Sequence, residues 1–340
     1  MSIDDLFRTG NGVKPKVKLA WLLLCVAASL TLWRIAGDLS MRVGPDVEIM
    51  HNAADVMLRA SAVIREAKSA RGLMQDKDLD PNRTGLIGPE WSETMTTVGR
   101  LSAKRTLTNP DTAALFSRLL RRAGLTRGDT VAVVLSGSFV GGNVAVLSAV
   151  ESYGLRPVVV SSLGASMYGA ADPDFTWLDM ETAVREAGVW RVRSIRALLG
   201  GEAGMARNLG EDARAALLES VRRANVPLIR GRSFSESVHE AAAVMGLGAG
   251  SESKPAVLVN VGGSLLALGD CLEAADIPYG LISEPIRCTR GTPGLIQIAL
   301  DQGVTVINAF KIREFARQYG LPNDPVPLPE PGKNAYIYSR

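Results

Sequence analysis

The sequence predicts an α/β domain with a doubly wound, mainly parallel sheet, preceded by one N-terminal transmembrane helix. Short apolar, β-branched runs alternate with helical patterns from about residue 110 onward, as in a parallel sheet that helices cover on both faces. The 34 glycines fit a fold with many strand-to-helix turns, and the 5% aromatic content requires a core of Ala, Val, Leu and Ile. The segment from Leu19 to Trp33 contains no charged side chain, which indicates a membrane span.

The predicted span runs from Val17 to Ala36. About 20 apolar residues of helix cross the hydrocarbon core, and this segment reaches that length when Lys18 and Arg34 extend their charged ends to the two surfaces. Four cations and two acids precede the uncharged stretch that begins at Leu19, and the charge asymmetry of the two flanks places the N-terminus in the cytoplasm by the positive-inside rule. We therefore expect a single-pass protein of the cytoplasmic (inner) membrane with its main domain extracytoplasmic. A cleaved signal peptide and a buried core helix are the alternative interpretations.

The sequence divides into four parts. Residues 1–40 form a cytoplasmic stub and transmembrane anchor, 41–80 a juxtamembrane helix and linker, 81–321 the α/β domain, and 322–340 a Pro-rich extended tail. A narrow apolar stripe predicts the juxtamembrane helix over 46–71. This stripe consists of Met50, Ala53, Met57, Ala60, Ile64 and Ala67. It can pack on the main domain, on a membrane partner or on a second copy of the chain.

The elements of the α/β domain follow in order. The strands are predicted at 130–135, 157–161, 193–198, 227–229, 256–261, 279–282 and 304–309. The helices are predicted at 113–123, 144–153, 178–187, 211–224, 235–245, 265–274 and 295–302. Residues 84–106 show neither period and combine hydroxyls, carboxylates and two adjacent cations, which is typical of a site-forming loop or of a surface loop.

Composition excludes several function classes. A net charge of +3 without a basic stripe gives no support for nucleic-acid binding. Two histidines and the absence of a CxxC motif argue against a zinc site of the common kind, and no metal is predicted. No dinucleotide or P-loop motif occurs, and we predict no cofactor. Cys271 and Cys288 either form a disulfide or stay as two unpaired thiols, while Cys25 would lie in lipid.

Candidate binding residues lie where strands end and helices begin, because ligands of a doubly wound sheet bind beyond the carboxyl ends of its strands. Two Gly- and Ser-rich turns there expose backbone N–H groups that attract anions. Arg287 and Arg290 form a small cationic mouth beside another helix start, and Arg105 adds a third guanidinium that suits carboxylates. The turn residues of this predicted anion site are Gly137, Gly262, Gly263 and Ser264. Alternatively the glycines only form turns and the arginines are solvated.

A nucleophile is also conceivable at the first of these turns. Ser136 or Ser138 would be well presented at a sharp strand-to-helix turn, although the motif is not G-x-S-x-G. Lys104 becomes a candidate base if burial lowers its pKa. The other candidate partners lie inside or at the start of predicted helices: His239, Asp179 and Glu181.

Several separated motifs carry a resemblance to a known family. They are Thr-Gly-Leu-Ile-Gly at 84–88, Ala-Lys-Arg-Thr at 103–106, Ser-Gly-Ser-Phe at 136–139, Gly-Ala-Ser at 164–166 and Phe-Thr-Trp-Leu-Asp-Met-Glu at 175–181. With the N-terminal anchor, the chain from about residue 17 to 315 resembles the bacterial poly-gamma-glutamate system protein family. The family has no assigned catalytic residue that would transfer to this chain. Val140-Gly141-Gly142 departs from the Pro-Ala-Leu-like segment that the family pattern has there, which puts in doubt any role that needs a rigid loop.

The resemblance implies a membrane-anchored accessory of a poly-γ-glutamate synthesis or export system that binds or processes the anionic polymer. Its expected partners are poly-γ-glutamate or another polyanionic carboxylate ligand, membrane synthase subunits and the membrane itself, and no nucleic acid; homo-oligomerisation stays open. One alternative is a serine-dependent amide hydrolase or transpeptidase that acts on the γ-glutamyl polymer. The other is a pure assembly protein that contacts the synthase through the helix at 46–71.

Overall fold

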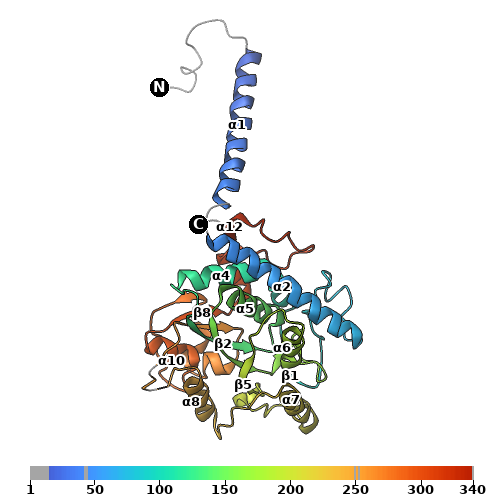
Figure 1. Ribbon diagram of the computed structural model, residues 1–340, viewed down its shortest axis with the longest axis vertical. Helices are drawn as coiled ribbons and strands as arrows, with labels where there is room; N and C mark the ends of the chain where they lie inside the picture. The colour runs from blue at the N-terminus through green and yellow to red at the C-terminus, as the bar shows by residue number, and fades with distance from the viewer. Residues whose placement is uncertain (1–14, 42–44, 249, 252, 339–340) are drawn as a thin grey trace. The chain divides into compact units, whose positions relative to one another are not determined.

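The structure, a computed structural model, describes residues 15–41, 45–248, 250–251 and 253–338. The expected cytoplasmic stub before residue 15 and the last two residues of the expected tail lie outside this range. The chain divides into two compact units, one with the helix α1 and the other from Pro45 to Tyr338. Figure 1 shows both.

The helix α1 spans Pro15–Met41. Its window Leu19–Ala36 is long and apolar enough to cross a membrane, and it is the single such helix in the described part of the chain. The large apolar side chains of this window are exposed, among them Trp21 at 64% and Trp33 at 78%. The length and composition of this window are compatible with the membrane span that the sequence predicts.

The second unit is an α/β domain with a mainly parallel sheet, as the sequence predicts. Its strands are β2 (Thr130–Ser136), β3 (Arg156–Ser162), β5 (Ser194–Leu198), β6 (Val257–Val261), β7 (Gly280–Ile282) and β8 (Thr305–Ala309). They form one sheet in the order β5-β3-β2-β6-β8-β7, in which the first five strands are parallel and β7 is antiparallel to β8. A separate two-stranded parallel sheet joins β1 (Met95–Thr97) to β4 (Ala165–Ser166).

Helices surround the six-stranded sheet. The longer ones are α2 (Pro45–Ala70), α4 (Asp111–Arg122), α5 (Val140–Tyr153), α6 (Trp177–Glu186), α7 (Glu211–Ala224) and α8 (Phe234–Val244). The shorter ones are α3 (Leu101–Thr106), α9 (Leu265–Leu268), α10 (Leu295–Asp301), α11 (Ile312–Gln318) and α12 (Ala335–Tyr338), with two 3₁₀ turns at Glu202–Gly204 and Leu272–Asp276.

Valine-rich strands explain why the core lies at the centre of this sheet. Ala132 and Val134 of β2 point to the side where α8 and α10 pack, and they share one apolar cluster with those helices. Val131 and Val133 point to the opposite side, because side chains alternate along a strand, and they are equally inaccessible to solvent. Both faces of β2 are therefore buried from solvent, which fits its near-continuous apolar sequence.

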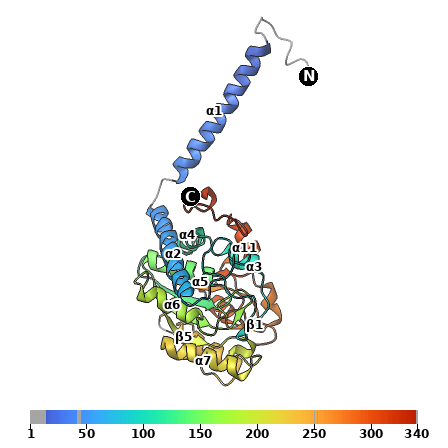
Figure 2. The same cartoon turned by 90° about the vertical axis from the view of Figure 1, so that its right-hand side faces the viewer.

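The apolar stripe of α2 packs on the domain itself. Met50, Ala53, Met57, Ala60 and Ile64 are all between 0% and 5% exposed. Figures 1 and 2 show α2 beside α4 and α5, with which it makes most of its contacts. Of the three packing arrangements that the sequence left open for this stripe, the structure contains the first.

Several local features differ from the sequence-based expectation, among them the helices α11 and α12, where no helix was predicted. Residues 227–229 form an isolated bridge at Leu228 rather than a full strand. The helix expected over 265–274 divides into α9 and a 3₁₀ turn, because Gly269 between them has a φ of 76°, which no helix residue adopts. Within 84–106, where no regular element is predicted, the chain forms β1 and α3.

The segment after α11 lies against the domain. Asn82 donates a hydrogen bond to the carbonyl oxygen of Pro325 (2.8 Å) and accepts one from the N–H of Leu328 (3.2 Å). Tyr338 is 1% exposed and its hydroxyl donates to the buried carboxylate of Asp111 (2.8 Å). The expected tail thus contributes to the same compact unit as far as it is described.

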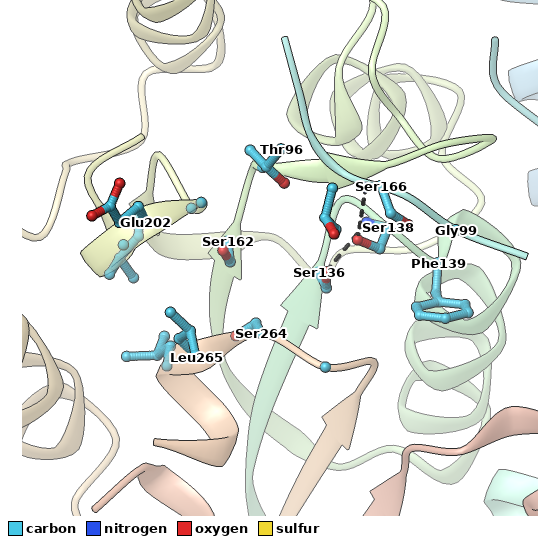
Figure 3. Close-up of a pocket in the computed structure, with 18 of the residues that line it drawn as sticks. Thr96, Gly99, Ser136, Ser138, Phe139, Ser162, Ser166, Glu202, Ser264 and Leu265 are labelled. Carbon is cyan, nitrogen blue, oxygen red and sulfur yellow. Dashed lines mark hydrogen bonds between the residues drawn. The ribbon is translucent and has the colours of Figure 1, made fainter. Parts of the chain in front are cut away.

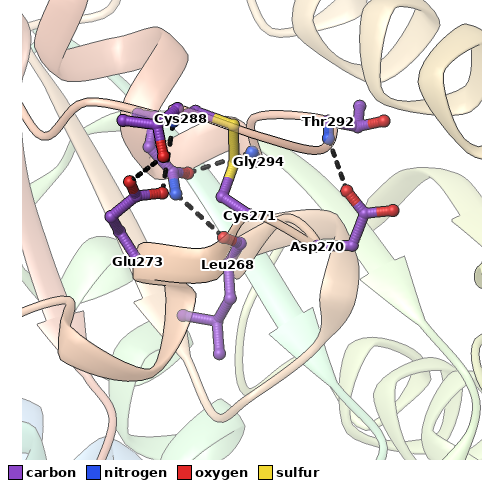
Figure 4. Close-up of a disulfide and its surroundings, with 9 residues drawn as sticks. Leu268, Asp270, Cys271, Glu273, Cys288, Thr292 and Gly294 are labelled. Carbon is purple, nitrogen blue, oxygen red and sulfur yellow. Dashed lines mark hydrogen bonds between the residues drawn. A yellow bond between two sulfur atoms is a disulfide. The ribbon is translucent and has the colours of Figure 1, made fainter.

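Cys271 and Cys288 form a disulfide, which Figure 4 shows with its surroundings. The bond closes a loop between residues 17 positions apart and ties the segment before α10 to the end of α9. A hydrogen bond from the side-chain amide of Gln297 to the carbonyl oxygen of Leu268 (3.0 Å) reinforces the same junction.

Candidate functional site

A cavity of about 470 Å³ lies beyond the carboxyl ends of β2, β3, β5 and β6. The strand order reverses at β2, whose neighbours are β3 on one side and β6 on the other. Crevices at such a reversal are the preferred ligand sites of open parallel sheets. Hydroxyl side chains dominate its polar lining, as Figure 3 shows: Thr96, Thr97, Ser136, Ser138, Ser162, Ser166 and Ser264.

Three serines and one lysine form a continuous chain of hydrogen bonds along one wall of the cavity. The N–H of Ser138 donates to the hydroxyl oxygen of Ser136 (3.2 Å), and the N–H of Ser166 donates to the hydroxyl oxygen of Ser138 (3.0 Å). The Nζ of Lys104 lies 2.6 Å from the hydroxyl oxygen of Ser166 and also donates to the carbonyl oxygen of Ser138. The hydroxyl of Ser136 thus holds the backbone of Ser138, and the hydroxyl of Ser138 holds the backbone of Ser166.

The pKa of the Lys104 amine lies near neutral pH. The residue is 4% exposed, and burial lowers its pKa from 10.5 to about 7. The ring of Phe139, whose centroid lies 3.8 Å from Nζ, and the carbonyl oxygen of Ser138 favour the charged form, but they do not offset the loss of hydration. No ion pair to Lys104 occurs among the described residues. Burial thus shifts Lys104 toward its uncharged form at neutral pH.

Ser166 reaches Lys104 because two distant segments pair through the small sheet. Ser166 lies in β4, and its partner strand β1 leads directly into α3, which carries Lys104. Gly99, between β1 and α3, allows a close approach: a Cβ at this position would lie 2.9 Å from the hydroxyl oxygen of Ser166 and 2.9 Å from the carbonyl oxygen of Met167. Only glycine fits there without displacing its neighbours.

The structure brings five of the sequence-predicted site residues to this cavity. Lys104, Ser136 and Ser138 line one wall, and Gly263 and Ser264 line another. The hydroxyl oxygen of Ser264 is buried without a hydrogen-bond partner among the described residues. The two strand-to-helix turns of β2 and β6 thus contribute to a single cavity.

The other predicted residues lie outside the lining. The N–H groups of Gly137 and Gly262 donate within the fold, to the carbonyl oxygens of Ser162 (2.8 Å) and Ala309 (3.0 Å). Arg105 pairs with Asp324 instead of facing the cavity (2.6 Å). Arg287 and Arg290 are exposed beside the disulfide and do not line the cavity. The expected cationic mouth and the glycine turns therefore do not meet in this structure.

The acidic and histidine candidates have other environments. Asp179 accepts the N–H of Thr176 (2.8 Å) at the start of α6 and pairs with Arg223 (2.9 Å). Glu181 is buried, which raises its pKa to about 7, and it accepts hydrogen bonds from the N–H and hydroxyl of Ser194. His239 is exposed on α8. None of them lines the cavity.

Sequence reasoning assigned no role to Ser166, Gly99, Arg100 or Glu202, which all line the cavity. The available signal for Ser166 was its position: Gly164-Ala165-Ser166 is a third Gly- and Ser-containing turn directly after a predicted strand. Glu202 comes four residues after the predicted strand at 193–198, whereas Gly99 and Arg100 follow no strand of the main sheet. Only the pairing of β1 with β4 makes them neighbours of the serines.

The chain matches no protein-family model, no curated protein and no solved structure. The chemistry of the site is accordingly inferred from its own geometry.

Proposed function

We propose that this protein is a serine–lysine acyl hydrolase or acyltransferase, anchored to a membrane by α1, that acts on amide bonds of poly-γ-glutamate. The observation that carries the proposal is the 2.6 Å contact between Nζ of Lys104 and the hydroxyl oxygen of Ser166 in a cavity of substrate size. The substrate comes from the resemblance of the motifs to the poly-gamma-glutamate system protein family. The domain is proposed to be doubly wound, with its site at the reversal of strand order.

The first chemical step follows from the protonation state of Lys104. The neutral amine accepts the proton of the Ser166 hydroxyl while its oxygen attacks the carbonyl carbon of the amide. The resulting lysine ammonium then gives this proton to the leaving nitrogen, the C–N bond breaks, and the acyl group stays on Ser166 as an ester. General-base assistance of this kind typically contributes about 10²- to 10⁴-fold in rate.

The second step regenerates the enzyme. Lys104 takes a proton from water, or from an acceptor amine, which attacks the ester carbon, and Ser166 leaves with that proton restored. Water gives hydrolysis and an amine gives transfer, so the same site supports either outcome. Ser138 and Ser136 have supporting roles, because their hydroxyl oxygens accept backbone N–H groups and fix the position of Ser166.

The location of the reaction is proposed to be extracytoplasmic. The charge asymmetry around the anchor predicts this orientation, and the disulfide between Cys271 and Cys288 supports it, because disulfides persist in oxidising compartments. A capsule-facing site would meet polymer as it leaves the synthase.

Two competing functions receive less support. A non-catalytic polymer-binding accessory was expected to bind through Arg105, Arg287 and Arg290, and these three residues do not line the cavity. A pure assembly protein was expected to use the apolar stripe of α2, but that stripe is buried on the domain itself.

The test is a turnover assay of the full-length protein in detergent with purified poly-γ-glutamate. Polymer length is measured by size-exclusion chromatography, and new amino groups are measured with an amine-reactive dye. We expect Ser166→Ala to reduce turnover at least ~100-fold. Ser235→Ala, which removes a partly exposed hydroxyl on α8 outside the cavity, is the matched control and should retain full activity. The proposal would be contradicted if Ser166→Ala turned over the polymer as fast as wild type. It would also be contradicted if the wild-type protein showed no turnover.

A further inference from the structure

The cavity lining contains three ionisable side chains among the described residues: Lys104, Arg100 and Glu202. Arg100 lies one helical turn before Lys104 and directly after Gly99, which packs against Ser166. Glu202 lies on the other side of the cavity from Ser138 and Ser166 in Figure 3. Both Arg100 and Glu202 are exposed, and neither side chain pairs with another described residue.

The position of Glu202 is fixed by the fold. Its backbone N–H donates to the side-chain oxygen of Asn208 (2.9 Å), and the side-chain amide of Asn208 donates to the carbonyl oxygen of Thr96 (3.1 Å). Thr96 belongs to β1, the strand that pairs with Ser166 in β4. The loop with the acid is thus tied to the same small sheet that places the proposed nucleophile.

A free carboxylate at this position repels a chain that carries a negative charge on every residue. It favours a substrate whose group at that point is positive, and poly-γ-glutamate has one such group, the ammonium at its amino end. Arg100, which lines the cavity and follows Gly99 beside Ser166, suits the free carboxylate next to the reacting amide.

We infer that the site acts at the amino end of the polymer, with Glu202 binding the terminal ammonium and Arg100 binding the adjacent α-carboxylate. This inference rests on the proposed function. In each cycle, the amide bond nearest the amino end breaks, and Ser166 carries the terminal γ-glutamyl group as an ester. The shortened chain leaves as the amine, which creates a new amino end. Water then releases the γ-glutamyl group as an acid, so one water is consumed for each amide broken.

The first experiment measures turnover with γ-glutamyl-p-nitroanilide and its N-acetyl derivative, using full-length protein in detergent. Wild type should prefer the free amine by up to about fivefold in kcat/KM, the upper end of the range expected for one exposed ion pair. Glu202→Gln should remove this preference through a higher KM and leave the N-acetyl substrate unaffected. Glu211→Gln, an exposed acid on α7 outside the cavity, is the control and should change neither substrate.

The second experiment separates recognition from chemistry. Calorimetry with the Ser166→Ala protein compares binding of γ-glutamyl-glutamate with its N-acetyl form, without and with Glu202→Gln. Tighter binding of the free amine that depends on Glu202 supports the inference, even where wild type shows no turnover and the proposed function fails. Turnover that depends on Ser166 while acetylation changes neither binding nor rate overturns the inference and leaves the proposed function standing. The absence of both binding preference and turnover overturns both.

Discussion

Arg105 and Asp324 form a two-point ion pair, with Nε to Oδ1 at 2.6 Å and Nη2 to Oδ2 at 2.7 Å. Both side chains are only 19% exposed. The N–H of Asp324 also donates to the hydroxyl oxygen of Thr106 (2.9 Å). The pair fastens the six-residue helix α3, which carries Lys104, to the segment after α11, and Figure 2 shows α3 and α11 side by side. A helix this short has no independent stability and depends on such tertiary contacts.

Asp324→Asn should therefore destabilise the domain and weaken catalysis together. Loss of a charge-assisted, largely buried pair is expected to lower the free energy of unfolding by about 1–3 kcal/mol. Because α3 also positions Lys104, kcat should fall more than KM rises. Denaturant titration and steady-state kinetics measure the two effects.

Arg222→Gln supplies the comparison, since its pair with Glu219 on α7 leaves the arginine side chain 76% exposed. That change should leave the free energy of unfolding essentially unchanged, because solvent screens an exposed pair. Equal destabilisation by the two substitutions would show that the Arg105–Asp324 pair has no special role.

The pH dependence of turnover should report the pKa of Lys104, which burial lowers to about 7. The protonated lysine cannot accept the Ser166 proton, so kcat/KM should rise about tenfold per pH unit below pH 7 and level off above it. A profile that is flat between pH 5 and 9 would exclude Lys104 as the base. Lys104→Arg keeps a cation but cannot deprotonate in this range, and it should lose activity about 100-fold or more at every pH.

Gly99→Ala should block the site without unfolding the protein. The added Cβ would lie 2.9 Å from the Ser166 hydroxyl oxygen, so either the nucleophile or β1 must shift. We expect kcat to fall about 10- to 100-fold, because small misplacements of reacting groups have effects of this size. Gly210→Ala is the control, since a Cβ there meets nothing within 4 Å. Unchanged kcat for Gly99→Ala would refute the close approach.

The Cys271–Cys288 disulfide should stabilise the domain mainly through its closed loop. For a separation of 17 residues, loop-closure entropy predicts a loss of about 3 kcal/mol on replacement of both cysteines by serine. Thermal or denaturant unfolding of the double variant measures this loss. Peptide mapping without reductant, on protein extracted from its native membrane, should recover the cross-linked pair, and recovery of two free thiols would argue against an extracytoplasmic domain.

Local patterns in the sequence identified most of the main sheet. The run Thr130 to Leu135 appears as β2, and the helix expected at 211–224 appears as α7 with the same bounds as predicted. Both predictions succeeded because the spacing of apolar residues in these segments matches the residues that are buried. Residues 84–106 gave no period, since β1 and α3 are short and owe their form to contacts with β4 and the segment after α11. For the same reason the serine turns were visible in the sequence, while the contact of Lys104 with Ser166 was not.

The amino-acid order by itself determined the apolar helix, the α/β class and the mainly parallel sheet, because each depends on the spacing of apolar residues along a short stretch of chain. Tertiary structure alone decided which hydroxyl meets Lys104, that burial lowers the pKa of this amine toward neutrality, and that Glu202 lies across the cavity from the serines. These properties arise between residues far apart in sequence, where distance and dehydration set the chemistry, and no local pattern encodes either.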